Sequence, residues 1–264
     1  MNLPAESVAL LEANGLGLRV LGEEVELWSP EQPKGVRRLS LHRLHELLDG
    51  RDDGAVARGM AFALAAPCLP AAFKFDFAGA AATITSLLDT PAFARGFNAL
   101  SESPATAWPL NRYHTLYFVF EGRDRRFAVT EALRAAWMVE EERVERAAAS
   151  MLLHRTRVEF QPVQGASFAM ERAFHNDGAD AARLTILATH LFDRARKGLM
   201  IAAPTPDHLF VAPLDRSSVA AFATAAFNIE ETRLRALPQV IYLIEAGTLL
   251  TEPLEWVASE RRFA

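Results

Sequence analysis

The chain has 264 residues, of which half are hydrophobic and 23% are charged, and its net charge at pH 7 is −5. This length and composition predict a folded protein with a substantial core, built as one large domain or two small ones. The acidic balance argues against a nucleic-acid partner, because neutralising phosphates requires an excess of Lys and Arg. A single cysteine, Cys68, excludes an intrachain disulfide and a cysteine-based metal site.

The sequence also predicts where the protein resides. The first fifteen residues lack the basic leader and the apolar core of a signal peptide. The longest apolar stretch, residues 60–73, is interrupted by Pro67 and Pro70 and is too short to span a bilayer. We therefore expect a soluble, cytoplasmic protein without a membrane partner.

The first sixty-five residues predict short helices and strands in alternation. Ser40 is a good N-cap for a helix whose leucines have helical spacing, and Gly50 ends that helix. A linker rich in Pro and Gly, SPEQPKGV, precedes it. The other predicted elements are a helix at residues 4–13, strands at 16–21 and 25–28, and a buried helix at 52–65.

Residues 67–110 are harder to assign. Residues 71–86 fit either a strand followed by a loop or part of a helix, whereas Thr90 and Pro91 form a good helix start. Pro104 and Pro109 mark a loop. We place there the boundary between an N-terminal α+β region, residues 1–105, and a C-terminal α+β region, residues 106–264, which can pack as one unit.

The pattern becomes clearer after Tyr113. Two strands flank a polar turn, EGRDRR, and Thr130 is a predicted cap for the helix that follows. Further elements are predicted as a helix from residue 139, short strands within 158–163 and 165–174, an amphipathic helix at 179–196, a helix in two pieces at 217–235, and one or two strands within 239–259.

A β-hairpin is predicted at the centre of this region. Two apolar runs, Leu199–Ala203 and Leu209–Ala212, flank a turn at residues 204–207, and Gly198 and Pro213 bracket the pair. Because helical patterns lie on either side, the predicted class is an α+β fold, with mixed sheets and β-hairpins flanked by helices.

Three stretches carry a resemblance to a known family. They are residues 109–152, the segment HNDG at 175–178 followed by Ala182-Arg183-Leu184, and the hairpin GLMIAAPTPDHLFVAP. In this order they resemble the uncharacterised bacterial family typified by the YtpQ protein, over roughly residues 109–250. The chain departs from that pattern at Thr205-Pro206, where a more polar pair is expected. The resemblance implies an α+β fold and brings no established activity.

Two histidines are the nearest match to metal ligands. His42 and His45 lie three residues apart on a predicted helix, so both imidazoles fall on one face. Zinc-protease motifs have the form HExxH or HxxEH, whereas Glu46 here gives HxxHE. We favour surface or interfacial histidines and expect no metal and no cofactor.

A polar set in the second half allows an enzyme hypothesis. Asp177 and Arg183 would pair at a helix start beside His175, and the hairpin turn would add Asp207 and His208. Turn chemistry is the explanation of the segment HNDG that we favour. No nucleophile elbow and no phosphate-binding loop occurs in the sequence. The resulting alternative is a small-molecule hydrolase.

The hypothesis that we favour is a non-catalytic protein-interaction or regulatory module. Loops on a rigid scaffold commonly carry recognition, and Arg123, Arg125 and Arg126 are the predicted partner-binding residues. The predicted partner is another protein. A homo-oligomer formed through Trp256 and Phe263 is also possible.

Overall fold

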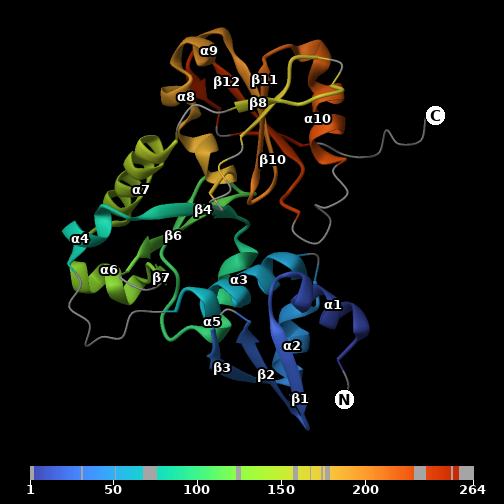
Figure 1. The fold of residues 1–264 in the computed structure, drawn as a ribbon, viewed down its shortest axis with the longest axis vertical. Coiled ribbons are helices and arrows are strands. Elements are labelled where there is room, and N and C mark those ends of the chain that lie inside the picture. Colours follow the sequence, from blue (N-terminus) through green and yellow to red (C-terminus); the bar gives the residue numbers. More distant parts are fainter. Residues whose placement is uncertain are drawn as a thin grey trace.

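The chain folds into helices and antiparallel sheets, which confirms the predicted α+β class. Figure 1 shows the computed structural model, in which the N-terminal elements lie at one end and the C-terminal sheet at the other. The middle of the chain lies between them and extends to one side. The structure describes residues 3–30, 32–50, 52–67, 76–122, 126–156, 160–166, 168–173, 175, 179–228, 236–250 and 252–255.

The N-terminal elements form an antiparallel three-stranded sheet covered by helices. Their bounds are α1 (Ala5–Ala13), β1 (Gly17–Leu21), β2 (Glu24–Ser29), β3 (Gln32–Ser40), α2 (Leu41–Leu48) and α3 (Asp53–Ala65). Val25 and Leu27 of β2 are fully buried, and β2 contacts α3. The side chain of Ser40 accepts a hydrogen bond from Arg43 N, so the predicted cap of α2 is confirmed.

The predicted linker at residues 29–36 is wrong for residues 32–36, which belong to β3. The β3 backbone pairs with β2 from Leu27↔Arg37 to Glu24↔Ser40 and again, beyond a bulge, at Ser29↔Gln32. Because β3 is an edge strand, its proline and glycine disrupt few of the backbone hydrogen bonds of the sheet. Composition indicated a loop, whereas pairing with β2 stabilises a strand.

Two helices that are distant in sequence, α3 and α5 (Ala92–Leu100), pack backbone against backbone. A Cβ at Gly59 would lie 2.0 Å from a carbonyl oxygen of α5, and a Cβ at Gly96 would lie 1.9 Å from a carbonyl oxygen of α3. Both distances are far below van der Waals contact, so any larger residue would push the helices apart. The close approach brings Arg58 beside Asp89, just before α5.

A second sheet occupies the middle of the molecule. Its strand order is β4-β6-β5, with β7 paired to β6. The elements here are α4 (Phe77–Ala81), β4 (Thr85–Asp89), β5 (Ala107–Pro109), β6 (Thr115–Glu121), β7 (Arg126–Ala128), α6 (Glu131–Trp137) and α7 (Glu141–Arg155). This sheet combines β4, from one side of the proposed boundary at residues 105 and 106, with three strands from the other side.

The third sheet is seven-stranded, and the predicted hairpin lies at its centre, in the order β13-β12-β10-β11-β9-β8 with β14 on β12. Its strands are β8 (Phe160–Pro162), β9 (Glu171–Ala173), β10 (Leu199–Thr205), β11 (His208–Pro213), β12 (Val240–Glu245), β13 (Thr248–Leu249) and β14 (Leu254–Glu255). The hairpin is confirmed, although its turn is confined to Pro206 and Asp207.

The two faces of the third sheet belong to different cores. Side chains such as Ile201, Val211 and Tyr242 join the core that also contains the middle sheet. The alternate residues Met200 and Phe210 pack instead with helix α10 (Val219–Phe227). The alternation of strand side chains therefore ties the middle sheet to one face of the third sheet and α10 to the other.

The predicted continuous helix at residues 179–196 is wrong. The segment divides into a 3-10 helix η1 (Ala181–Thr185) and two short helices, α8 (Leu187–His190) and α9 (Phe192–Lys197). Residues 181–184 are all buried and only Thr185 of η1 is partly exposed, so η1 is largely enclosed by protein. The predicted helix at 217–235 begins as a short 3-10 turn, η2 (Arg216–Ser218), and continues as α10; residues 229–235 lie outside the described residues.

None of the helices in the described part of the chain combines the length and the apolar character that crossing a membrane requires.

Candidate functional site

A buried ion pair joins α3 to the end of β4. Arg58 donates from Nε and from one terminal nitrogen to the two carboxylate oxygens of Asp89, at 2.6 and 2.7 Å. The side chains are only 7% and 3% exposed. Two parallel charge-assisted bonds of this kind are strong and directional. The pairing is also necessary, because an unpaired charge at this depth is strongly destabilising.

The residues around Asp89 hold its carboxylate in place. Asp89 Oδ1 also accepts a hydrogen bond from Thr90 N at 2.8 Å, and Tyr117 Oη donates to Thr90 O at 3.0 Å. Burial, helped by the negative charge of Asp89, raises the pKa of Tyr117 well above its ordinary value. Tyr117 therefore stays a neutral donor at physiological pH.

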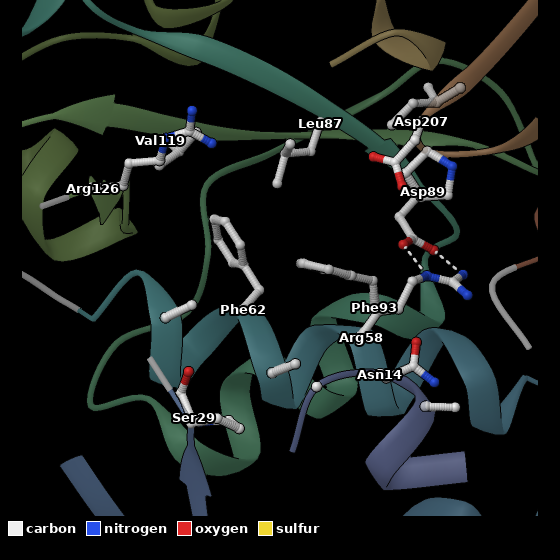
Figure 2. Close-up of a pocket in the computed structure, with 17 residues that line it drawn as sticks. Asn14, Ser29, Arg58, Phe62, Leu87, Asp89, Phe93, Val119, Arg126 and Asp207 are labelled. Carbon is white, nitrogen blue, oxygen red and sulfur yellow. Dashed lines mark hydrogen bonds and ion pairs between the residues drawn. The ribbon is translucent and has the colours of Figure 1, made fainter. Parts of the chain in front are cut away.

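A cavity of about 520 Å³ lies beside this ion pair (Figure 2). Its walls come from three distant parts of the chain: the N-terminal helices and sheet, the middle sheet, and the β10–β11 turn. The lining residues are Ala13, Asn14, Gly15, Ser29, Pro30, Arg58, Ala61, Phe62, Ala65, Leu87, Leu88, Asp89, Phe93, Val119, Arg126, Pro206 and Asp207.

The charged groups of the cavity gather at two ends. Figure 2 shows the Arg58–Asp89 pair and Asp207 at one end and Arg126 at the other, with Phe62 and Leu87 between them. Arg126 is 51% exposed and lies 3.8 Å from a carboxylate oxygen of Glu121. An apolar middle with a few polar groups is the usual composition of a site for a small organic molecule.

Arg58 also lines a second cavity, of about 710 Å³, which reaches from α1 to the residues before β12. Glu6, Asp53 and Thr90 line it as well. The hydroxyl oxygen of Thr90 is buried and has no hydrogen-bond partner among the described residues. The Arg58 side chain therefore separates two cavities.

The predicted hydrolase residues in the second half form a different cluster. Arg183 donates to Asp180 Oδ1 at 3.1 Å and to Thr156 Oγ1 at 3.0 Å, and His175 Nδ1 lies 2.8 Å from the same Asp180 oxygen. Arg183 is fully buried. Asp177, its predicted partner, lies outside the described residues. Asp180, which the hypothesis did not include, is the acid that joins Arg183 to His175.

The hairpin turn lies beside this cluster, since Ala181 N donates to Pro206 O at 3.0 Å. Its two predicted site residues are in different places. Asp207 lines the first cavity, whereas His208 Nδ1 lies 2.7 Å from Thr205 Oγ1. Of the four predicted residues that the structure describes, only Asp207 is among those that line this cavity.

Of the predicted partner-binding arginines, Arg126 is on β7 and lines the cavity. Arg123 and Arg125 lie outside the described residues.

The predicted metal candidates share helix α2. His42 Nε2 lies 3.3 Å from Glu46 Oε1, and its side chain is 78% exposed. His45 Nε2 is buried without a hydrogen-bond partner among the described residues. Across the part of the chain that the structure describes, no group of three or more His, Cys, Asp or Glu side chains is arranged to hold a metal ion.

Arg58 and Asp89 are not among the predicted site residues, although the sequence carries a signal for each. Arg58 is the only basic residue in DGAVARGMAFALA, a helix predicted to be buried, and a buried arginine requires a carboxylate partner. Asp89 ends the apolar strand TSLLD directly before a helix start. The sequence does not indicate that the two meet, because 31 positions separate them.

No family model, curated protein or solved structure matches the chain. The resemblance to the YtpQ family therefore stays a prediction.

Proposed function

We propose that this chain is a non-catalytic regulatory module that binds a small organic molecule in the cavity beside the Arg58–Asp89 pair and acts on another protein. One observation carries the proposal: a cavity of about 520 Å³ whose walls come from the N-terminal helices, the middle sheet and the hairpin turn. A cytoplasmic location and a bacterial source, expected from the sequence, belong to the same proposal.

The size and lining of the cavity support a small-molecule ligand. Sites for such ligands measure about 300–1,000 Å³ and combine apolar walls with a few polar groups. Here Phe62 and Phe93 supply aromatic surface, with ring centroids 5.6 Å apart. The Arg58–Asp89 pair supplies a fixed dipole at one end, and such a group orients a polar ligand.

The origin of the walls supports regulation. Asn14 follows α1, Asp89 ends β4, and Asp207 lies in the β10–β11 turn. A ligand that contacts all three parts would stabilise the arrangement in which they surround it. Ligand binding would thereby be communicated to surfaces on both ends of the molecule.

The hydrolase is the second candidate, and one observation favours it. The hydrogen bond from Ala181 N to Pro206 O holds the hairpin turn beside the His175–Asp180–Arg183 cluster. His175 paired with an aspartate has the arrangement of a general base and its orienting group. We rank it second because Arg183 is fully buried, which favours a structural role for the cluster.

A thermal-shift screen on two proteins tests the first proposal. The wild type and Ala61→Phe, which fills the cavity from α3, are each heated with a library of amino acids, amines, carboxylic acids, nucleotides and sugars. A ligand at one hundred times its dissociation constant stabilises the folded state by about 2.7 kcal/mol, which raises the melting temperature by several degrees.

The expected result is a shift in the wild type that Ala61→Phe abolishes. Ala65→Phe, which enters from the next turn of α3, is the second blocking variant if Ala61→Phe does not fold. If no compound in the library shifts the melting temperature, ligand binding is contradicted. If the shifts are equal in the wild type and the variants, binding in this cavity is contradicted. Hydrolysis of a library ester by the wild type, lost in His175→Gln, would favour the second candidate.

A further inference from the structure

Arg112 and Tyr113 form a clamp that binds a carboxylate at the edge of the third sheet, and neither residue lines the two cavities described above. Arg112 donates to Glu255 Oε1 at 2.8 Å, and Tyr113 Oη donates to the same oxygen. The guanidinium of Arg112 also lies over the Tyr113 ring, with its central carbon 4.7 Å from the ring centroid. The two donors therefore converge on one carboxylate oxygen, and the cation–π contact holds them together.

The clamp is built on a turn that other residues fix in place. Asn111 Oδ1 accepts hydrogen bonds from the backbone N–H groups of Tyr113 and His114, at 2.9 and 3.1 Å. Asn111 Nδ2 donates to Tyr242 Oη at 2.8 Å, and His114 Nδ1 lies 2.6 Å from the same oxygen. His114 and Tyr242 are completely buried. The turn is thus anchored to β12 by contacts that do not involve Glu255.

The residue that occupies the clamp is held much less firmly. Glu255 belongs to β14, which has two residues, and both are exposed. They pair with the start of β12 through Ile241↔Leu254 and Val240↔Glu255. Short exposed edge pairings of this kind open with little free energy.

The pairing along β12 is also interrupted. β13 pairs with its far end, at Ile244↔Leu249 and Glu245↔Thr248, and Leu250 N donates to Leu243 O. Residues 251–253 lie between Leu250 and β14 in the sequence. Leu254 is 44% exposed although it is a large apolar side chain. β14 can therefore leave β12 while β13 stays paired, and its departure uncovers both the strand edge and the clamp.

We propose that the β12 edge and the Arg112–Tyr113 clamp form a docking site for an extended acidic segment of a partner protein, and that β14 occupies this site when the partner is absent. The partner segment would add to the sheet as a strand next to β12, in the position of β14. Its Asp or Glu side chain would take the place of Glu255 between Arg112 and Tyr113. The segment Leu254–Glu255 defines the chemistry of the occupant: an apolar residue followed by a carboxylate.

A peptide-binding experiment tests the proposal on the full-length chain. The probe is a fluorescent peptide, Leu-Thr-Glu-Pro-Leu-Glu-Trp, and a second peptide has Gln in place of its second Glu. The chain's own strand competes at an effective concentration in the range of mM, so the wild type should bind weakly. Glu255→Arg removes the internal carboxylate and places a repelling charge beside Arg112.

Glu252→Arg is the matched control, because it makes the same charge change at an exposed residue only three positions away. By fluorescence anisotropy, Glu255→Arg should bind the Glu peptide at least tenfold more tightly than do the wild type and Glu252→Arg. The Gln peptide should lose most of this gain. Adding Arg112→Ala to Glu255→Arg should abolish it.

Hydrogen exchange gives an independent measurement. In Glu255→Arg, the amide of Ile241, which is paired with Leu254, should exchange at least tenfold faster than in Glu252→Arg, while those of β10 stay protected. Glu255→Gln replaces Glu255→Arg if the latter does not fold. Equal affinity of Glu255→Arg and Glu252→Arg for the Glu peptide, or of the Glu and Gln peptides for Glu255→Arg, would overturn the proposal. Unchanged exchange at Ile241 would overturn it as well.

Discussion

Two buried arginine–aspartate pairs, Arg58–Asp89 and Arg183–Asp180, use the same chemistry in different surroundings. Arg58 is 7% exposed and lines two cavities, whereas Arg183, a residue of η1, has no exposed surface and donates a hydrogen bond to Thr156. The first pair lies where a ligand or water can approach it, and the second is surrounded by protein. The comparison shows that pairing satisfies a buried charge, while the space around the pair decides whether it can also take part in binding.

The largest loss of stability is expected from breaking the enclosed pair, Arg183–Asp180. Asp180→Ala removes a carboxylate that accepts a hydrogen bond from the fully buried Arg183 and that lies 2.8 Å from His175 Nδ1. The free energy of unfolding should fall by about 3–5 kcal/mol in urea denaturation. Asp193→Ala, at an exposed position of α9, is the control and should change it by less than about 0.5 kcal/mol. A loss of under 1 kcal/mol in Asp180→Ala would contradict the enclosed character of this pair.

A smaller loss of stability is expected from breaking the pair beside the cavities, Arg58–Asp89. In Asp89→Ala the unpaired Arg58 can be hydrated from either cavity, so the free energy of unfolding should fall by about 2 kcal/mol. Urea denaturation under the same conditions gives the comparison. If Asp89→Ala costs as much as Asp180→Ala, the cavities do not provide the hydration that we infer.

Sensitivity of the stability to acid is expected at His190, close to the enclosed pair. Burial, followed by the positive charges of His175 and Arg183, lowers the pKa of His190 below its ordinary value of 6.5. The unfolded chain therefore takes up a proton at this residue before the folded chain does, and stability falls as the pH drops below about 6.5. His190→Gln should show a smaller decrease in melting temperature between pH 7 and pH 5 than the wild type.

His154→Gln is the control for that measurement, because His154 is an exposed residue of α7. It should keep the wild-type decrease. If His190→Gln and His154→Gln behave alike, the titration of His190 does not contribute to acid sensitivity.

The smallest effect on stability is expected at the open end of the cavity. Arg126 is half exposed and its ion pair with Glu121 is long, at 3.8 Å. Arg126→Ala should therefore change the free energy of unfolding by less than about 0.5 kcal/mol. A loss above 1 kcal/mol would show that Arg126 has a structural role that its exposure does not suggest.

Local sequence patterns were sufficient for much of the fold. Helix α2 follows from the Ser40 cap and four leucines at helical spacing, and the hairpin follows from two apolar runs between Gly198 and Pro213. Both signals depend on residues that are close in sequence. The segment at 179–196 was misassigned because its apolar residues fit a helix, whereas burial of residues 181–184 and the contacts of Arg183 divide it.

The sequence by itself determined the α+β class, most of the helices and strands, and the central position of the β10–β11 hairpin. The tertiary structure alone decided that residues 32–36 form a strand, that Arg58 meets Asp89, and that Asp207 lines the same cavity as this pair. The physical reason is the range of the interactions. Capping, turn formation and periodic burial act between near neighbours, whereas ion pairs, edge pairing and cavities depend on segments that only the complete fold brings together.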